Sequence, residues 1–246
     1  MKTYTHTHDV HNYKAANEIV PVIIKWLKPY SVIDVGCGIG TWLSVFKGEG
    51  VSRVYGVDGD YVNRKQLVIS ETDFLPKDLE QPLELKNRYD LVVSLEVAEH
   101  LSENSAQSFI NSLCNLGNTI LFSAAITAQG GQNHINEQAP NFWIKKFEDN
   151  GYKLFDVLRP KFWDNQNVDW WYKQNIMIFT KDNKVGEILK DLKTFEGRHL
   201  VHPILFENRS YESRKLTSKI LKIENGNKQM SYYFKLFIKS FKNIFS

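Results

Sequence analysis

The 246-residue chain has 42% hydrophobic and 24% charged residues, an ordinary globular composition that allows one sizeable core. Its formal net charge of +3 is too small to indicate a nucleic-acid partner, and its two cysteines exclude a disulfide framework or a cysteine-based zinc site. The N-terminal residues lack the apolar stretch of a signal peptide, and no run approaches the roughly 20 apolar residues of a membrane span. We therefore expect a cytoplasmic protein.

Segments with strand and helix patterns alternate over residues 1–182, which we expect to form one domain. Helices are predicted over 15–27, 41–48, 105–116 and 139–151, and strands over 31–35, 53–58, 67–69, 89–96, 118–125, 152–158 and 174–181. This alternation predicts an α/β fold, a Rossmann-like doubly wound sheet of seven mostly parallel strands. Because no helix separates the last two strands, they should pair antiparallel at one edge.

A glycine-rich turn follows the first strand in "VIDVGCGIG". Gly36, Gly38 and Gly40 let the backbone approach a ligand closely, and the next helix presents free N–H groups. A nicotinamide-binding domain prefers G-x-G-x-x-G, whereas the spacing here is G-x-G-x-G. Asp34 would repel a pyrophosphate but can hold a cation, which favours S-adenosylmethionine (SAM), whose sulfonium and amino groups are positive.

A second cluster of ionisable groups, Glu96, Glu99 and His100, follows the strand at 89–96 in "SLEVAEHL". On a helix these three positions would share one face. The carboxyl ends of parallel strands meet at one edge of an open α/β sheet, where ligands bind. We therefore expect this cluster and the glycine turn to face the same cleft.

The motifs "VIDVGCGIGTWL", "YGVDGD", "TDFLP" and "YDLVVSLEVAEHL" resemble, in order and spacing, those of class I SAM-dependent methyltransferases. The resemblance covers roughly residues 11–181. It implies that the glycines lie beneath the methionine part, that Asp34 contacts the amino group and that Asp58 accepts both ribose hydroxyls. Asp73 and Phe74 would read the adenine. The implied cofactor-binding residues are Asp34, Gly36, Gly38, Gly40, Asp58, Asp73, Phe74 and Leu95.

The segment 124–175 is similar to a bacterial methyltransferase subgroup associated with surface-polysaccharide (capsule) biosynthesis. It is rich in aromatic residues, whose faces stack on sugar rings. Transfer of a methyl group to a hydroxyl is an in-line displacement that requires loss of a proton, and a neutral imidazole suits that task. We expect His134 to be the base, with His100 as the second candidate and Glu96 beside it.

The same side chains raise a metal alternative. Glu96, Glu99, His100 and His134 resemble the "ExxEH" plus distant histidine that holds a metal in RNA-end 2′-O-methyltransferases. The "EVxEH" motif also occurs in metal-free methyltransferases, where it braces the cleft. We expect no metal and keep these four residues as an alternative divalent site.

Residues outside the strand and helix series carry three further expectations. The N-terminal residues 1–28 should form a lid and a helix, with His11 or Tyr13 touching the ligand. Residues 183–246 should form a helical extension. Its tail, 229–246, predicts a basic amphipathic helix that packs on the chain itself, on a mate in a homodimer, or on the inner face of a membrane.

These observations favour a SAM-dependent O-methyltransferase with S-adenosylhomocysteine as product. The expected acceptor is a small molecule or glycan precursor: a sugar, a sugar nucleotide or a related surface-glycan precursor, with a phosphoramidate oxygen as a variant. An RNA methyltransferase and a non-catalytic SAM-binding subunit are the alternatives. The modest net charge and the lack of a basic stripe count against RNA, so no nucleic-acid partner is expected.

Overall fold

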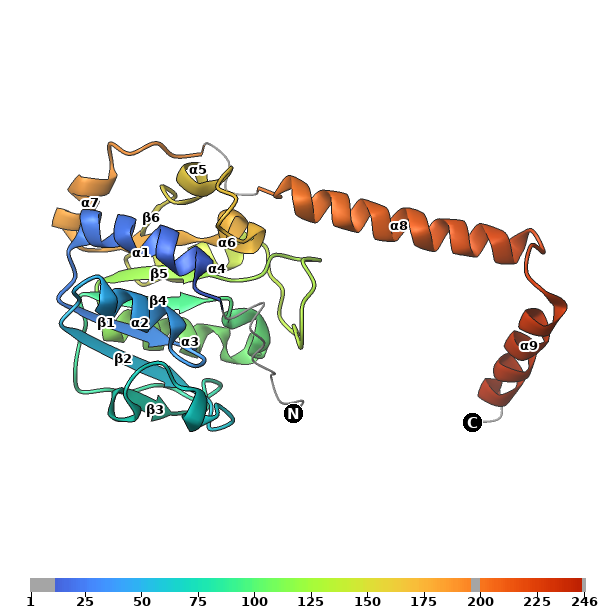
Figure 1. The fold of residues 1–246 in the computed structure, drawn as a ribbon, viewed down its shortest axis with the longest axis horizontal. Helices are drawn as coiled ribbons and strands as arrows, with labels where there is room; N and C mark the ends of the chain where they lie inside the picture. The colour runs from blue at the N-terminus through green and yellow to red at the C-terminus, as the bar shows by residue number, and fades with distance from the viewer. Residues whose placement is uncertain (1–11, 196–199, 245–246) are drawn as a thin grey trace. The chain divides into compact units, whose positions relative to one another are not determined.

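The computed structural model describes residues 12–195 and 200–244 (Figure 1). The chain divides into two compact units, Met1–His202 and Pro203–Ser246, which we describe separately. The expected lid lies largely outside the described residues, as does His11. Tyr13 directly precedes the first helix, α1 (Lys14–Leu27).

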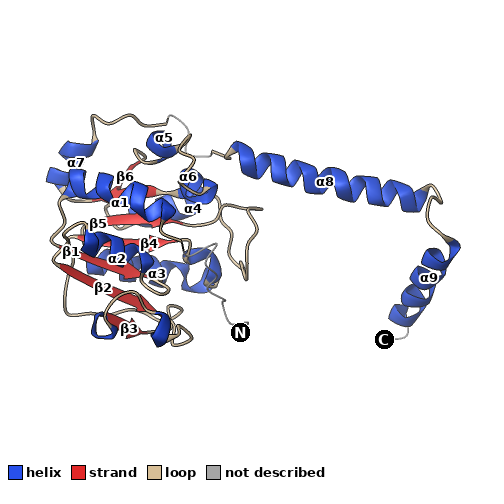
Figure 2. Cartoon of the chain, in the orientation of Figure 1, coloured by secondary structure: helices blue, strands red, loops and turns tan. Residues whose placement is uncertain are grey.

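The first unit is built on a seven-stranded sheet in the order β3-β2-β1-β4-β5-β7-β6 (Figure 2). Neighbouring strands from β3 to β5 pair parallel, whereas β7 pairs antiparallel with both β5 and β6. The strands are β1 (Ser31–Val35), β2 (Arg53–Asp58), β3 (Phe74–Pro76), β4 (Leu91–Leu95), β5 (Thr119–Ser123), β6 (Lys153–Phe155) and β7 (Met177–Thr180). The predicted doubly wound fold and its antiparallel pair are confirmed.

The third strand lies further along the chain than predicted. Residues 67–69 are outside any strand, and β3 begins at Phe74 after the short 3₁₀ helices η1 (Arg64–Gln66) and η2 (Glu71–Asp73). In the register of the sheet, Gly56 faces Phe74 and Asp58 faces Pro76. The apolar run "LVI" therefore does not continue the sheet, although Ile69 is buried in the core.

Helices cover both faces of the sheet because successive strand residues point to opposite sides. Val32 packs into the core beneath α1 and α2 (Thr41–Gly48), and the adjacent Ile33 packs into the core beneath α3 (Ala106–Leu116) and α4 (Pro140–Asp149). These helices match the predicted ones. Contrary to the expectation that no helix separates the last two strands, two short helices, α5 (Arg159–Phe162) and α6 (Trp170–Asn175), lie between β6 and β7 in the sequence.

The first unit extends about twenty residues beyond the boundary expected at residue 182. Helix α7 (Asn183–Leu189) belongs to it, since Leu189 is fully buried in the core that contains α1. The backbone N–H of His202 donates to Gln174 Oε1 at 2.8 Å, which ties this later segment to α6. Buried apolar contact keeps α7 with the sheet, and the hydrogen bond ties His202 to the same unit.

The second unit is helical, as predicted, with α8 (Pro203–Glu224) and α9 (Met230–Ile244). The Tyr233 hydroxyl donates to the carbonyl of Ile223 at 2.8 Å and fixes the turn between them. Among the described residues, no helix is both long and apolar enough to cross a membrane.

Candidate active site

The glycine turn after β1 has the conformation that its sequence requires. Gly36 adopts φ +89°, and its N–H donates to the Val57 carbonyl at 2.7 Å. A Cβ at this position would lie 2.2 Å from Val97 Cγ2, so only glycine fits. Gly40, also at φ +89°, precedes α2 directly. The turn thus brings bare backbone and the start of a helix to the carboxyl edge of the sheet.

Asp58 closes the glycine turn from the end of β2. Its Oδ2 accepts the Gly38 N–H at 2.6 Å, and its Oδ1 accepts both the Gly59 N–H and the Tyr61 hydroxyl at 2.6 Å. Because Oδ2 has one donor and two lone pairs, it can accept a further hydroxyl. Sequence reasoning missed Tyr61, which is 52% exposed and covers the carboxylate that was assigned to the ribose.

Asp34 lies in β1 next to this carboxylate and is buried. Burial and the charge of Asp58 raise its pKa well above the usual range of an aspartate. Burial and repulsion both make it unfavourable for Asp34 and Asp58 to be negatively charged together. A bound cation would reduce this repulsion. The pair therefore fits the positive amino group for which Asp34 was singled out. Leu95, the last residue of β4, is buried at the same edge.

Asp73 and Phe74 lie at the wrong end of β3 for a cofactor contact. Asp73 precedes the strand and Phe74 begins it, two residues short of the level of Asp58, whereas ligands bind beyond the carboxyl ends. Asp73 is 3.9 Å from Lys47 Nζ, and the Phe74 ring lies 4.4 Å from the Arg64 guanidinium carbon. The residues that leave β3 at the ligand edge are Lys77, whose N–H donates to the Asp58 carbonyl at 2.8 Å, and Asp78.

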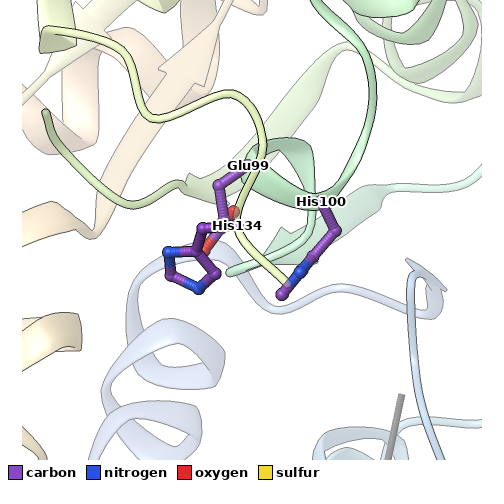
Figure 3. Close-up of side chains that lie close together, drawn as sticks. All are labelled: Glu99, His100 and His134. Atoms are coloured by element: carbon purple, nitrogen blue, oxygen red, sulfur yellow. The ribbon is translucent and has the colours of Figure 1, made fainter. Parts of the chain in front are cut away.

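The acceptor side is assembled from two segments distant in sequence (Figure 3). Glu99 and His100 end the 3₁₀ helix η3 (Ala98–His100), and His134 comes from the loop after β5. The Glu99 carbonyl accepts the N–H groups of Ile135 and Asn136 at 2.9 and 3.0 Å, which anchors the loop on η3. The His100 and His134 rings consequently meet edge to face, with centroids 4.9 Å apart.

The electrostatics of this cluster favour neutral side chains. Burial and the neighbouring Glu96 charge raise the pKa of Glu99 well above its usual range. Burial and the charge of His134 lower the pKa of His100 to about 4, so His100 is an uncharged imidazole at neutral pH. Both carboxyl oxygens of Glu99 and Nδ2 of Asn136 are buried and have no hydrogen-bond partner among the described residues. Buried polar atoms are normally hydrogen-bonded, so these three can bind a polar ligand.

Glu96 turns away from the cluster, contrary to the expected shared helix face. It precedes η3 with φ +54°, a left-handed conformation that is costly for a non-glycine residue. Its carboxylate accepts Gln129 Nε2 and Asn175 Nδ2, each at 3.1 Å, and burial raises its pKa. Gln129 and Asn175 therefore fix the direction of the Glu96 carboxylate, which still lies near enough to Glu99 for its charge to raise the pKa of Glu99.

Of the four residues in the alternative metal site, three lie together in the structure and Glu96 is not among them. One ligand atom each from Glu99, His100 and His134 lies within 4.8 Å of the others. Two imidazoles and one carboxylate suit a transition metal better than Mg²⁺, which prefers oxygen ligands. The same three side chains also carry the donors and acceptors that can hydrogen-bond a hydroxyl group.

Comparisons with known proteins agree with this geometry. A family described as a methyltransferase domain matches residues 11–176. No protein with a curated function matches the sequence.

Three solved structures illustrate the likeness of fold. The sugar N-methyltransferase KedS8 from Streptoalloteichus sp ATCC 53650 is 11% identical, with a TM-score of 0.56 over 73% of this chain and 94% of its own. The methyltransferase domain of bacterial CtHen1 is 21% identical, with a TM-score of 0.51 over 69% and 98%. Magnesium protoporphyrin IX methyltransferase from Synechocystis PCC 6803, solved with bound S-adenosylhomocysteine, is 20% identical, with a TM-score of 0.50 over 70% and 84%. The family match over residues 11–176 shows that the chain belongs to the methyltransferase-domain family, and the glycine turn, Asp58 and the sheet order agree with it. The protein is therefore a class I SAM-dependent methyltransferase.

Proposed function

We propose that this enzyme transfers a methyl group to a hydroxyl of a sugar, a sugar nucleotide or a related surface-glycan precursor. An oxygen of a phosphoramidate group is a variant of the same acceptor chemistry. The observation that carries the proposal is the meeting of His134 with Glu99 and His100 at the carboxyl edge of the sheet, the edge that the glycine turn and Asp58 also occupy.

The chemistry follows from the residues at this edge. SAM supplies the methyl group, and the acceptor oxygen must lose its proton as the new bond forms. His134 takes that proton, which a neutral imidazole does well near neutral pH. Glu99, whose pKa is raised well above its usual range, and Asn136 can form hydrogen bonds with neighbouring hydroxyls. Adjacent donors and acceptors of this kind suit a polyol better than an apolar acceptor. The sugar methyltransferase KedS8 has the same fold, which supports an acceptor of this class.

A panel of acceptors tests the proposal. The enzyme is incubated with methyl-labelled SAM and, separately, with nucleoside diphosphate sugars, free sugars, a phosphoramidate ester and a small RNA with free 3′ hydroxyls. We expect label in a sugar or sugar nucleotide, with an amount of S-adenosylhomocysteine equal to the transferred label. Label in the RNA alone would contradict the sugar acceptor. S-adenosylhomocysteine binding without transfer to any acceptor would favour a non-catalytic subunit.

An RNA acceptor is the second candidate, because one observation favours it. CtHen1 shares the fold, and two residues of the "EVAEH" segment, Glu99 and His100, lie beside His134, which is part of the arrangement that the resemblance to RNA-end methyltransferases implies. Against it stands the small net charge of +3, since phosphate contacts dominate RNA affinity. A steep salt dependence of acceptor binding would distinguish RNA from a sugar.

We also propose that α9 lies on an anionic lipid surface. Residues 225–246 contain four lysines and no acidic residue, and α9 is amphipathic. The full-length protein should sediment with vesicles of phosphatidylcholine and phosphatidylglycerol but not with phosphatidylcholine alone. Substituting Lys235→Glu together with Lys239→Glu should abolish this. Binding that ignores lipid charge, or a dimer in solution without vesicle binding, would contradict the proposal.

A further inference from the structure

We infer that Glu137 is a positioning residue that orients the imidazole of His134 and leaves its Nε2 atom to accept the proton. This inference rests on the proposed base role of His134 and extends it to a residue that sequence reasoning missed. Nothing in the sequence spacing singles out Glu137, which lies in a loop without helical or strand periodicity.

The contact that carries the inference is short and sheltered. Glu137 Oε1 lies 2.8 Å from His134 Nδ1, and the two side chains are 18% and 12% exposed. The same oxygen accepts the Gly130 N–H at 2.5 Å. A carboxylate held by a backbone donor and partly shielded from water makes a stronger, better directed bond to an imidazole than an exposed ion pair does.

The loop around this pair is tied down on both sides. The Glu137 carbonyl accepts the Thr127 hydroxyl at 3.5 Å, and Ile135 and Asn136 donate to the Glu99 carbonyl. Gly131 packs against the His134 ring so closely that a Cβ there would lie 2.2 Å from Nε2. The ring therefore has little freedom to rotate, and Glu137 sets which nitrogen carries the hydrogen.

The chemistry follows from that assignment. A carboxylate at Nδ1 favours the tautomer with hydrogen on Nδ1, because the N–H donates to the oxygen, and the lone pair is then on Nε2. The acceptor O–H gives its proton to Nε2, and the electron pair left on oxygen forms the bond to the methyl carbon as the carbon–sulfur bond of the donor breaks. The resulting imidazolium keeps its Nδ1–H bond to Glu137, which stabilises its positive charge.

The test compares Glu137→Gln with the matched control Glu103→Gln. Glu103 Oε2 accepts Gln138 Nε2 of the same loop at 3.4 Å, a contact that does not involve His134, so its loss tests mere tethering of the loop. We expect Glu137→Gln to lower kcat at least about tenfold, as loss of the partner of a working histidine does, with little change in KM or S-adenosylhomocysteine affinity. Glu103→Gln should behave as wild type. Glu137→Asp keeps the carboxylate on a side chain one methylene shorter, so its kcat should lie between those of Glu137→Gln and the wild type.

A spectroscopic readout separates orientation from stability. In ¹⁵N-labelled protein, His134 should show the Nδ1–H tautomer, and Glu137→Gln should shift it toward Nε2–H. Wild-type kcat in Glu137→Gln, with a slow His134→Ala, would overturn this inference alone. Loss of S-adenosylhomocysteine binding in Glu137→Gln would assign the carboxylate to loop folding and also overturn it. Normal turnover in His134→Ala would instead overturn the proposed base role.

Discussion

His134→Ala is expected to slow methyl transfer by about 10²–10⁴-fold, the usual cost of losing a general base. Affinity for S-adenosylhomocysteine should be nearly unchanged, since His134 stands on the loop after β5 and the glycine turn stands after β1. Single-turnover rates and a calorimetric titration measure the two effects. His202→Ala is a matched control, because His202 is a buried histidine of the same unit whose ring contacts Trp163. Turnover equal to wild type would exclude the base role.

Treatment with a chelator decides whether His134 acts as a free base or as a ligand. If it acts as a free base, EDTA should leave turnover unchanged, and Glu99→Gln should be mild because an amide of the same shape replaces a carboxyl whose burial disfavours its charged form. If the three residues hold a metal, EDTA should stop turnover, Mn²⁺ should restore it better than Mg²⁺, and Glu99→Gln should be nearly as damaging as His134→Ala. We expect the first outcome, because Glu96 points to Gln129 and Asn175 and leaves a single carboxylate in the cluster.

Gly36→Ala is expected to abolish S-adenosylhomocysteine binding and to destabilise the fold by about 2–6 kcal/mol. The alanine would be strained at φ +89°, and its Cβ would lie 2.2 Å from Val97 Cγ2, so the turn or β4 must shift. Thermal melts with and without S-adenosylhomocysteine measure both effects, since a ligand of the folded state raises the melting temperature. An unchanged ligand-induced shift would contradict the assignment of this turn to the cofactor.

Two further variants separate backbone strain from steric clash. Gly151 has φ +80°, but a Cβ there meets no atom within 4 Å, so Gly151→Ala should cost only the strain. The double variant Gly36→Ala with Val97→Ala removes the contacts at 2.2 and 2.7 Å and leaves only the Val97 Cβ at 3.0 Å, so part of the lost stability and binding should return. If the double variant is no better than Gly36→Ala, strain at φ +89° rather than Val97 is the cause.

Several features could be predicted from the sequence alone because they depend on local pattern. Apolar runs bounded by glycine, and their alternation with helical segments, led to the doubly wound sheet and its antiparallel pair. The glycines at 36, 38 and 40 were predicted to turn beneath a ligand, since positive φ is readily adopted by glycine, and all three have it. The common edge of β1, β2 and β4 followed from strand order.

The third strand shows where local pattern failed. The run at 67–69 is apolar because Ile69 fills the core, whereas β3 begins at Phe74 and is only three residues long. With the strand placed too early, Asp73 was assigned to the ligand edge. In a parallel sheet only the carboxyl end of each strand faces the ligand. Because β3 lies later in the chain than predicted, the residues at this end are those after Pro76 and not Asp73.

The direction of side chains in the acceptor site was decided only by the tertiary structure. Glu96, Glu99 and His100 have helical spacing, but the left-handed backbone at Glu96 sends its carboxylate to Gln129 and Asn175. The partner of His134, Glu137, and the packing of His134 against His100 depend on how a loop is hydrogen-bonded to η3. Sequence patterns report which residues a segment buries, whereas these contacts depend on backbone angles at single residues and on distances between segments that meet only in the folded chain.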